Sequence, residues 1–273
     1  MITLKWTILI QMVIILTRTI TQCFEFGNLQ PLNTYIHDEK CFTQGLLYHD
    51  NKLYESCGLY GKSSLRVMDA KSKNLLTKIK IDDKYFAEGI TILNNKLYML
   101  LWQQQFVLVF DLKTLKQVDI KYIETFKKEG WGLTTDGTHL IVSDGSDRIQ
   151  FYEVKSDSKY LKKVKEIVVR DPSTQRSVDR INELQYVNDS IYANIWYKDV
   201  IIRINAKNGI IHDKYDLSSI YPRNKRSRTA DCLNGIAYDP SDKTFLLTGK
   251  LWDKYYKVDL MSHSKTRENK NDF

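Results

Sequence analysis

Apolar strands and polar turns alternate along the chain, and one pattern of them occurs five times. Each copy opens on a polar or aromatic residue, continues into an apolar strand, turns at a short polar stretch and runs back. Two strands joined by such a turn are predicted to form a β-hairpin. The five openings are Gln44-Gly45-Leu46, Glu88-Gly89-Ile90, Trp131-Gly132-Leu133, Asn182-Glu183-Leu184 and Asn234-Gly235-Ile236.

The other strands of each copy also fall at matching positions. The apolar residue that opens the return strand lies eight positions after the Gly position, or ten in the last copy: Leu53, Leu97, Leu140, Ile191 and Phe245. A third strand then ends at Asp69, Asp111, Glu153, Asn205 and Asp259. A fourth apolar segment follows in four copies, at residues 75–81, 117–123, 164–169 and 210–217.

This repeat of about 44 to 52 residues, with four short strands per unit, is typical of a β-propeller. We therefore predict an all-β fold, a five-bladed β-propeller with four-stranded blades. The fifth copy has only three strands, so the N-terminal strand at residues 29–36 is predicted to close the last blade. Such closure hides the edge strands that an open array would expose.

The propeller prediction places two rings of residues at one mouth of the central channel, because the first strand of every blade lines that channel. The ring before the Gly positions consists of Gln44, Glu88, Trp131, Asn182 and Asn234. The ring on the return strands consists of Gly58, Trp102, Gly145, Trp196 and Lys250, and Phe42 and Phe86 lie two residues before the first ring. These positions differ between copies while strand interiors agree, which indicates a functional site on a uniform scaffold.

The residue types at this mouth favour proton transfer on an amide group. Counting back across the turn at Asn94 and Asn95 places Trp102 beside Glu88. A carboxyl group against a large apolar ring loses solvation, which raises its pKa and lets it carry a proton near neutral pH. Carboxamides offer a donor and an acceptor to an amide. A single carboxyl suits proton transfer better than metal binding, since hard cations want several oxygen ligands.

The N-terminal region predicts entry into the secretory pathway. Residues 6–16 form a short apolar run after Lys5, too short to span a bilayer and typical of a signal peptide. Residues 17–23 lack a clear small-x-small cleavage site, so an uncleaved anchor remains an alternative, and without one we expect no membrane insertion. We expect a secreted protein, with Asn188 in the one N-glycosylation sequon.

The four cysteines lack the spacing of a zinc site, so no metal ligands are predicted from them. Cys23 lies at the presumed cleavage point. A disulfide among Cys41, Cys57 and Cys232 suits an oxidising compartment, but the sequence leaves its pairing open.

The net charge of +8 does not indicate a nucleic-acid partner, because the basic residues are interleaved with acidic ones and form no stripe with aromatics. Two basic concentrations, residues 223–228 and 265–270, are interpreted as a solvated loop and tail. We predict residues 1–23 as signal peptide or anchor, 24–262 as one propeller domain and 263–273 as a polar tail. We expect a monomer.

The chain, through the ring residues and the motifs around them, resembles the plant-type and bacterial glutamine cyclotransferases (glutaminyl-peptide cyclotransferases). The resemblance extends in order over about residues 30–260. The matching motifs are Phe42-Thr43-Gln44-Gly45-Leu46, residues 59–65, Phe86-Ala87-Glu88-Gly89, Gly130-Trp131-Gly132-Leu133, Ile181-Asn182-Glu183-Leu184, residues 233–238 and residues 248–252. Cys41, Cys57 and the basic loop at 223–228 depart from the family pattern, and the loop leaves the peptide preference beyond the glutamine open.

The resemblance implies an acyltransferase that converts the N-terminal glutamine of peptides and proteins to pyroglutamate and releases ammonia without a catalytic metal. It implies Glu88 and Lys250 as catalytic residues. It implies substrate contacts from Phe42, Gln44, Phe86, Trp102, Trp131, Asn182 and Trp196. No cofactor is expected for catalysis. Some members are associated with a structural calcium ion, for which no ligands are identified here.

Two other classes of protein remain as alternatives. The residues alone favour a non-enzymatic propeller that binds peptides or proteins at the same mouth. A metal-dependent propeller lactonase or hydrolase would need several carboxylates on the channel ring, and the predicted ring holds only Glu88. Release of ammonia from a peptide that begins with glutamine would separate these alternatives.

Overall fold

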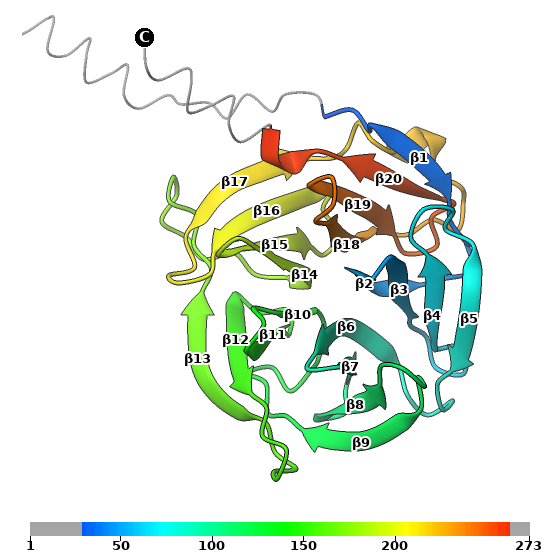
Figure 1. The fold of residues 1–273 in the computed structure, drawn as a ribbon. Helices are drawn as coiled ribbons and strands as arrows, with labels where there is room; N and C mark the ends of the chain where they lie inside the picture. Colours follow the sequence, from blue (N-terminus) through cyan, green and yellow to red (C-terminus); the bar gives the residue numbers. More distant parts are fainter. Residues whose placement is uncertain (1–28, 263–273) are drawn as a thin grey trace, which may run out of the picture.

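The protein forms five antiparallel four-stranded sheets arranged as blades around a central axis, in a computed structural model that describes residues 29–262 (Figure 1). The predicted five-bladed propeller is confirmed. No helix in this described part is long and apolar enough to cross a bilayer. The predictions made for residues 1–23 and for the tail at 263–273 lie outside the described residues.

The strands follow one another outward from the axis in each blade. Blade 1 consists of β2 (Thr43–His49), β3 (Lys52–Cys57), β4 (Ser64–Asp69) and β5 (Leu75–Lys80). Blade 2 consists of β6 (Ala87–Leu93), β7 (Lys96–Leu101), β8 (Phe106–Asp111) and β9 (Gln117–Tyr122). Blade 3 consists of β10 (Leu133–Thr135), β11 (His139–Ser143), β12 (Arg148–Glu153) and β13 (Lys162–Val168).

The last two blades complete the ring. Blade 4 consists of β14 (Ile181–Val187), β15 (Ser190–Ile195), β16 (Val200–Asn205) and β17 (Ile211–Asp216). Blade 5 consists of β18 (Leu233–Asp239), β19 (Thr244–Gly249), β20 (Lys254–Val258) and, outermost, β1 (Asn33–Ile36). The 3-10 helix η1 (Arg223–Lys225) lies in the loop between them.

Strand β1 closes the ring as predicted, since it pairs antiparallel with β20 from Asn33 opposite Lys257 to Ile36 opposite Lys254. The strand is shorter than the predicted segment 29–36. Leu29 is instead buried in the apolar cluster that contains Trp252. The first and last parts of the described chain therefore share one sheet (Figure 1).

The apolar residues that open the return strands form the matching core of the blades. All five are fully buried: Leu53, Leu97, Leu140, Ile191 and Phe245. They pack in clusters that join each blade to its neighbours, so every blade depends on the next for its core. The same apolar position is therefore needed in every blade, and its repetition in the sequence predicts the five-bladed fold.

A β-bulge lies at the mouth end of four of the five inner hairpins. The register shifts by one residue between Thr43 and Gly45, and the same shift occurs at the corresponding positions of blades 2, 4 and 5. A bulge leaves its extra residue unpaired and changes the direction of its side chain. The bulges therefore free Gln44, Glu88, Asn182 and Asn234 from the regular alternation of the strands.

The inner strands approach so closely at the axis that most blades need glycine there. A Cβ atom on Gly132 would lie 2.1 Å from the carbonyl oxygen of Asn182, and one on Gly89 would lie 2.4 Å from the nitrogen of Leu133. Blade 4 instead carries Glu183 at this position. Its carboxyl group accepts hydrogen bonds from the backbone nitrogens of Leu46 (2.7 Å) and Ile236 (2.5 Å), so it connects β14 to β2 and β18.

The basic loop between blades 4 and 5 is not simply solvated, which corrects the interpretation from the sequence. The side chain of Arg226 is 9% exposed and pairs with Asp199 at 2.7 Å. Its guanidinium also lies 4.9 Å from the ring centre of Trp252. The cation therefore anchors the loop against blade 5 instead of facing solvent.

Cys41 and Cys57 form a disulfide that closes a loop of 16 residues, and Cys232 is free and buried. The bond joins the segment before β2 to the end of β3. The first of these precedes Gln44 in the chain, and the second lies beside it in the sheet. Leu251 also donates its backbone N–H to the carbonyl oxygen of Cys41, so this corner is tied to the segment that carries Lys250.

Replacing both Cys41 and Cys57 by alanine is expected to lower the free energy of unfolding by about 3 kcal/mol, the value for a loop of this length. Urea unfolding under oxidising conditions measures the loss. The matched control is Cys232→Ala, which removes a buried thiol without opening a loop. A double variant no less stable than this control would contradict a stabilising role for the disulfide.

Candidate active site

Glu88 lies in the bulge of β6 at the mouth of the channel, and its side chain is almost completely buried. Gln44 donates a hydrogen bond from Nε2 to Oε1 of Glu88 at 3.0 Å. Ser56 donates from its hydroxyl to the backbone oxygen of Glu88 at 2.5 Å. Blade 1 thus holds both the backbone and the carboxyl group of this residue.

Burial raises the pKa of Glu88 well above its ordinary value of 4.5. The positive charge of Lys250 acts against this shift, and the negative charge of Glu129 adds to it. The carboxyl group therefore keeps its proton at a pH where an exposed glutamate has lost it. Such a group suits proton transfer near neutral pH.

Two aromatic walls border the mouth. In one, the ring of Phe86 lies 5.5 Å from those of Trp102 and Tyr60, and 6.2 Å from that of Phe42. In the other, Trp131 and Trp196 meet edge to face at 5.4 Å. All of the predicted aromatic site residues are partly exposed at this mouth, so a ligand can reach their rings.

The polar residues of the two rings also lie here. Lys250 is buried, with Nζ 4.9 Å from the ring centre of Phe42. Asn234 donates from Nδ2 to the backbone oxygens of Thr43 (3.0 Å) and Gln44 (3.2 Å), which fixes the strand that carries Gln44. In the described part of the chain, Oδ1 of the buried Asn182 has no hydrogen-bond donor. Such an acceptor requires a partner.

The prediction that Trp102 lies directly beside Glu88 is wrong in register. Trp102 pairs across the hairpin with Phe86, because its backbone nitrogen bonds the carbonyl oxygen of Phe86 at 3.1 Å. The bulge after Ala87 adds one residue to β6, and simple counting from the turn cannot detect it. Trp102 and Glu88 still lie at the same mouth.

Glu129 is the main site residue that the sequence did not reveal. Its Oε2 accepts hydrogen bonds from the indole nitrogens of Trp131 (2.8 Å) and Trp102 (3.0 Å), so it links the two aromatic walls. It lies two positions before Trp131, as Phe42 lies before Gln44 and Phe86 before Glu88. Extending that comparison to the third copy would have found it.

The prediction that Glu88 is the one acid near the channel is also wrong. Glu129 lies at the mouth, and Glu183 lies at the axis. Burial raises the pKa of Glu183 well above its ordinary value, while its two backbone donors act against the shift. Glu183 accepts hydrogen bonds from the inner strands, and Glu129 accepts hydrogen bonds from two indoles. The three acids therefore do not form one oxygen cluster.

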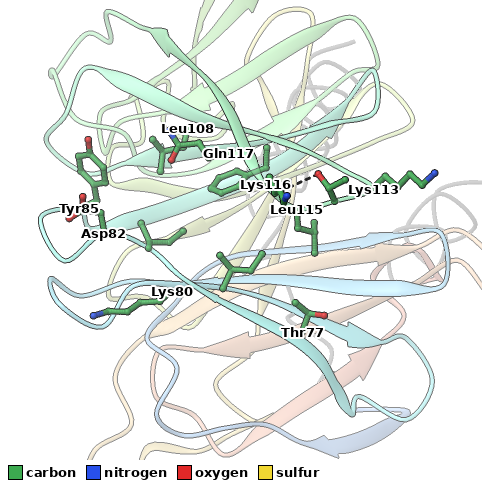
Figure 2. Close-up of a pocket in the computed structure, with 13 residues that line it drawn as sticks. Thr77, Lys80, Asp82, Tyr85, Leu108, Lys113, Leu115, Lys116 and Gln117 are labelled. Atoms are coloured by element: carbon green, nitrogen blue, oxygen red, sulfur yellow. Dashed lines mark hydrogen bonds between the residues drawn. The ribbon is translucent and has the colours of Figure 1, made fainter.

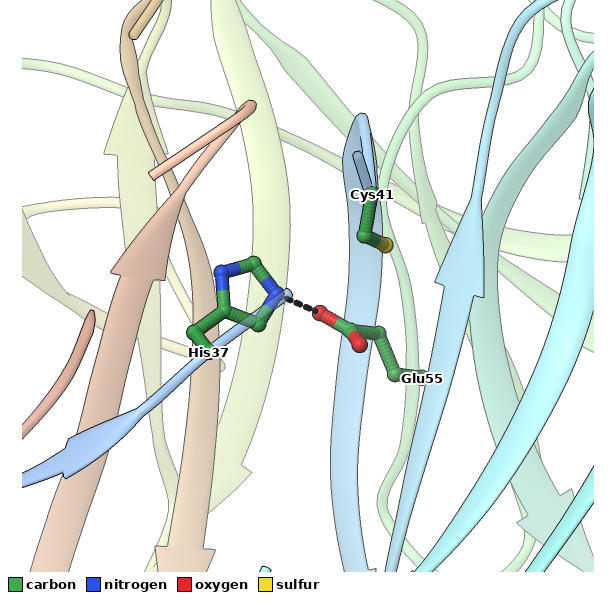
Figure 3. A group of neighbouring side chains, drawn as sticks. All are labelled: His37, Cys41 and Glu55. Atoms are coloured by element: carbon green, nitrogen blue, oxygen red, sulfur yellow. Dashed lines mark hydrogen bonds and ion pairs between the residues drawn. The ribbon is translucent and has the colours of Figure 1, made fainter. Parts of the chain in front are cut away.

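A potential metal site lies between blades 5 and 1, where His37, Cys41 and Glu55 bring ligand atoms within 4.8 Å of one another (Figure 3). The sequence did not predict it, because it depends on the fold. Cys41 is already bonded to Cys57, and Nε2 of His37 lies 2.9 Å from Oε1 of Glu55. Thr43 also donates to that carboxylate at 2.8 Å.

The charges of this group favour an internal ion pair. Although burial acts in the opposite direction, His37, Arg66 and a hydrogen bond from Thr43 hold the pKa of Glu55 below its ordinary value. The ring nitrogen Nδ1 of His37 lies 2.6 Å from the carbonyl oxygen of Trp252. These partners use the groups that a metal would need, so the cluster does not fit a zinc ion in the oxidised protein.

A cavity of about 600 Å³ lies between the outer strands of blades 1 and 2 (Figure 2). Its lining includes Thr77, Lys80, Leu108 and Lys116, and it contains none of the ring residues. The cavity is therefore separate from the mouth that holds Glu88.

Comparisons with known proteins agree on one family. A family model described as glutamine cyclotransferase matches residues 7–260. The chain is 38% identical over 241 residues to a glutaminyl-peptide cyclotransferase of Arabidopsis thaliana, covering 87% of this chain and 73% of the relative. The fold is similar to the crystal structure of Myxococcus xanthus glutaminyl cyclase, with a TM-score of 0.73 and 27% identity over 84% of this chain and 97% of that one.

Proposed function

The chain belongs to the glutamine cyclotransferase family, and we propose that it cyclises N-terminal glutamine by a metal-independent route in which Glu88 carries the proton. The protein is a glutaminyl-peptide cyclotransferase, and its substrates are peptides with N-terminal glutamine. The observation that supports the mechanism is one buried carboxyl group of raised pKa among carboxamides, indoles and a lysine.

The pocket suits the side chain of glutamine. The apolar stem lies between the two aromatic walls, which exclude water. The unpartnered Oδ1 of Asn182 accepts a hydrogen bond from the carboxamide nitrogen of the substrate. The reaction is intramolecular, so holding the folded side chain near its own α-amine supplies much of the rate enhancement.

Glu88 moves one proton during the reaction. The α-amine nitrogen attacks the side-chain carbonyl carbon, and a new N–C bond forms. The ionised carboxyl group of Glu88 takes a proton from this nitrogen and delivers it to the leaving nitrogen as the old C–N bond breaks. The products are the pyroglutamyl peptide and ammonia. Gln44 orients Oε1 of Glu88 through its 3.0 Å hydrogen bond.

Lys250 stabilises the oxygen that becomes negative in the tetrahedral intermediate. Its ammonium is buried, so its charge acts more strongly there than it would in water. The same charge limits how far the pKa of Glu88 is raised, which keeps that group able to lose its proton. Lys250 therefore acts on both the intermediate and the proton carrier.

The donor set at the mouth supports a reaction without a metal ion. Hard cations bind several oxygen ligands, whereas the groups that act on the carboxyl of Glu88 are Gln44, Lys250 and the single acid Glu129. We also propose that any calcium ion associated with the fold is structural and takes no part in the chemistry.

The purified protein is expected to release one ammonia for each glutamine-initiated peptide that it cyclises, and EDTA is expected to leave this rate within about twofold. A coupled ammonia assay with mass analysis of the peptide measures both. The same glutamine-initiated peptide incubated without the protein provides the control for spontaneous cyclisation. No ammonia would favour a binding propeller, and loss of activity with EDTA that zinc restores would overturn the metal-independent route.

We further propose that the protein is secreted and carries a glycan at Asn188. The Cys41–Cys57 disulfide supports an oxidising compartment. Asn188 lies exposed in the turn between β14 and β15, at the end of the blade away from Asn182, so a glycan there leaves the mouth open.

A further inference from the structure

Glu129 holds the indoles of Trp102 and Trp131 with only one of its two oxygens. Both indole hydrogen bonds, at 3.0 and 2.8 Å, end on Oε2. Within residues 29–262, Oε1 makes no hydrogen bond, and the residue is only partly buried. The carboxylate is therefore fixed in position and has one oxygen available at the mouth.

The charges at the mouth make Oε1 of Glu129 the acceptor best suited to a positively charged substrate. A peptide with a free N-terminus arrives as an ammonium ion near neutral pH, since the α-amino group has a pKa of about 7.7 to 8.0. Lys250 repels that charge. Burial raises the pKa of Glu88, which favours its neutral form over its charged form. Glu129 is the remaining acid among the side chains placed in the pocket.

We propose that Glu129 binds the α-ammonium group of the incoming N-terminal glutamine through Oε1. This proposal rests on the cyclotransferase function, and it adds a residue that recognises the free N-terminus. The indole faces of Trp102 and Trp131 contribute a second attraction, because aromatic faces also bind cations. Glu129 accordingly binds substrate and positions the two aromatic walls with the same carboxylate.

In this arrangement Glu129 binds the substrate and Glu88 transfers the proton. Glu129 binds the α-ammonium group and takes no part in the proton transfer. The docked ammonium first loses one proton to solvent and becomes the neutral amine. As this amine attacks the carbonyl carbon it gives a second proton to the ionised Glu88, which passes it to the leaving nitrogen, so ammonia leaves and the proton count balances. Lys250 and Glu129 are the two charged groups that act on Glu88.

Glu129→Gln tests the proposal, because glutamine keeps an acceptor oxygen for the two indoles and removes the charge. We expect the KM for a glutamine-initiated peptide to rise about 10- to 100-fold, the usual effect of losing a charged hydrogen bond. The second ligand is a desamino analogue, in which hydrogen replaces the α-amine of the same peptide. Its inhibition constant is expected to stay within about twofold. Glu124→Gln, an exposed acid in the same loop, is the matched control.

The pH profile provides a second measurement that a purely structural role would not move. Removing the negative charge of Glu129 lowers the pKa of Glu88, since that charge raises it. The acidic limb of kcat/KM is therefore expected to shift to lower pH in Glu129→Gln and to stay in place in Glu124→Gln.

Each outcome has one meaning. An unchanged KM and pH profile in Glu129→Gln, with an active wild type, would overturn the ammonium-binding role alone. Equal weakening of substrate and desamino analogue would show that Glu129 only supports the tryptophans, and would also overturn it. A wild type that releases no ammonia would overturn the proposed function itself.

Discussion

Replacing Glu88 by glutamine is expected to lower kcat by about 10³-fold or more while the propeller stays folded. Glutamine has nearly the same shape and can still accept the hydrogen bond from Nε2 of Gln44. It cannot take a proton from the attacking amine or return one to the leaving nitrogen. The ammonia assay measures the loss, and substrate binding is expected to change little. Glu124→Gln is the matched control for removing an acid from the mouth region.

The same variant is expected to be at least as stable as the wild type, and increasingly so as pH rises. The folded-state pKa of Glu88 lies above the ordinary value of 4.5, so the folded protein binds more protons than the unfolded chain in that range. The contribution of this group to stability is therefore full below about pH 4.5 and is lost as pH rises through the raised pKa. Glutamine has no charge to bury. A difference in Tm that stays constant from pH 4 to 9 would contradict the raised pKa.

Glu183→Ala is expected to lower the free energy of unfolding by about 3 kcal/mol or more. The substitution leaves the backbone nitrogens of Leu46 and Ile236 without acceptors at the buried axis, and each orphaned donor costs about 1 to 3 kcal/mol. It also leaves a void where three inner strands meet. Urea unfolding followed by tryptophan fluorescence measures the change in midpoint.

Two variants separate this role from a general effect of mutation. Glu183→Gln keeps one acceptor oxygen and is expected to lose about half as much stability. Glu39→Ala changes an exposed acid and is expected to change stability by less than about 0.5 kcal/mol. If Glu183→Ala unfolds at the same urea concentration as Glu39→Ala, the carboxyl group does not hold the axis together.

The fold could be predicted from the sequence because the blades repeat. Each copy places an apolar residue such as Leu53 or Leu97 where its blade packs against the next, and the same physical need produces the same pattern five times. The closing strand followed from counting, since the fifth copy lacked one strand. The strand β1 is nevertheless shorter than predicted, because Leu29 belongs to the core and not to the sheet.

The position of the site followed from the same repeat, but its contacts did not. A bulge is a local backbone feature with no clear signature in one sequence, so Trp102 was placed beside Glu88 instead of Phe86. The link from Glu129 to two indoles joins residues from different blades, and pairing by sequence within one hairpin could not show it. Likewise, the three cysteines allowed several pairings, and only the fold brings Cys41 to Cys57.

The structure gathers Gln44, Glu88 and Lys250 at one mouth with the aromatic residues, as the ring argument predicted. It adds Glu129 to that group. The fold therefore brings together residues that lie far apart in the sequence.

The titration of Glu88 itself tests the central claim most directly. Carbon-13 NMR of the glutamate carboxyl carbons, with the Glu88 signal assigned by its loss in Glu88→Gln, follows the protonation of this one group. The account predicts a midpoint well above 4.5, because burial disfavours the charged form. A midpoint at or below 4.5 would mean that Glu88 is an ordinary ionised carboxylate near neutral pH, and it would contradict the proposed proton carrier.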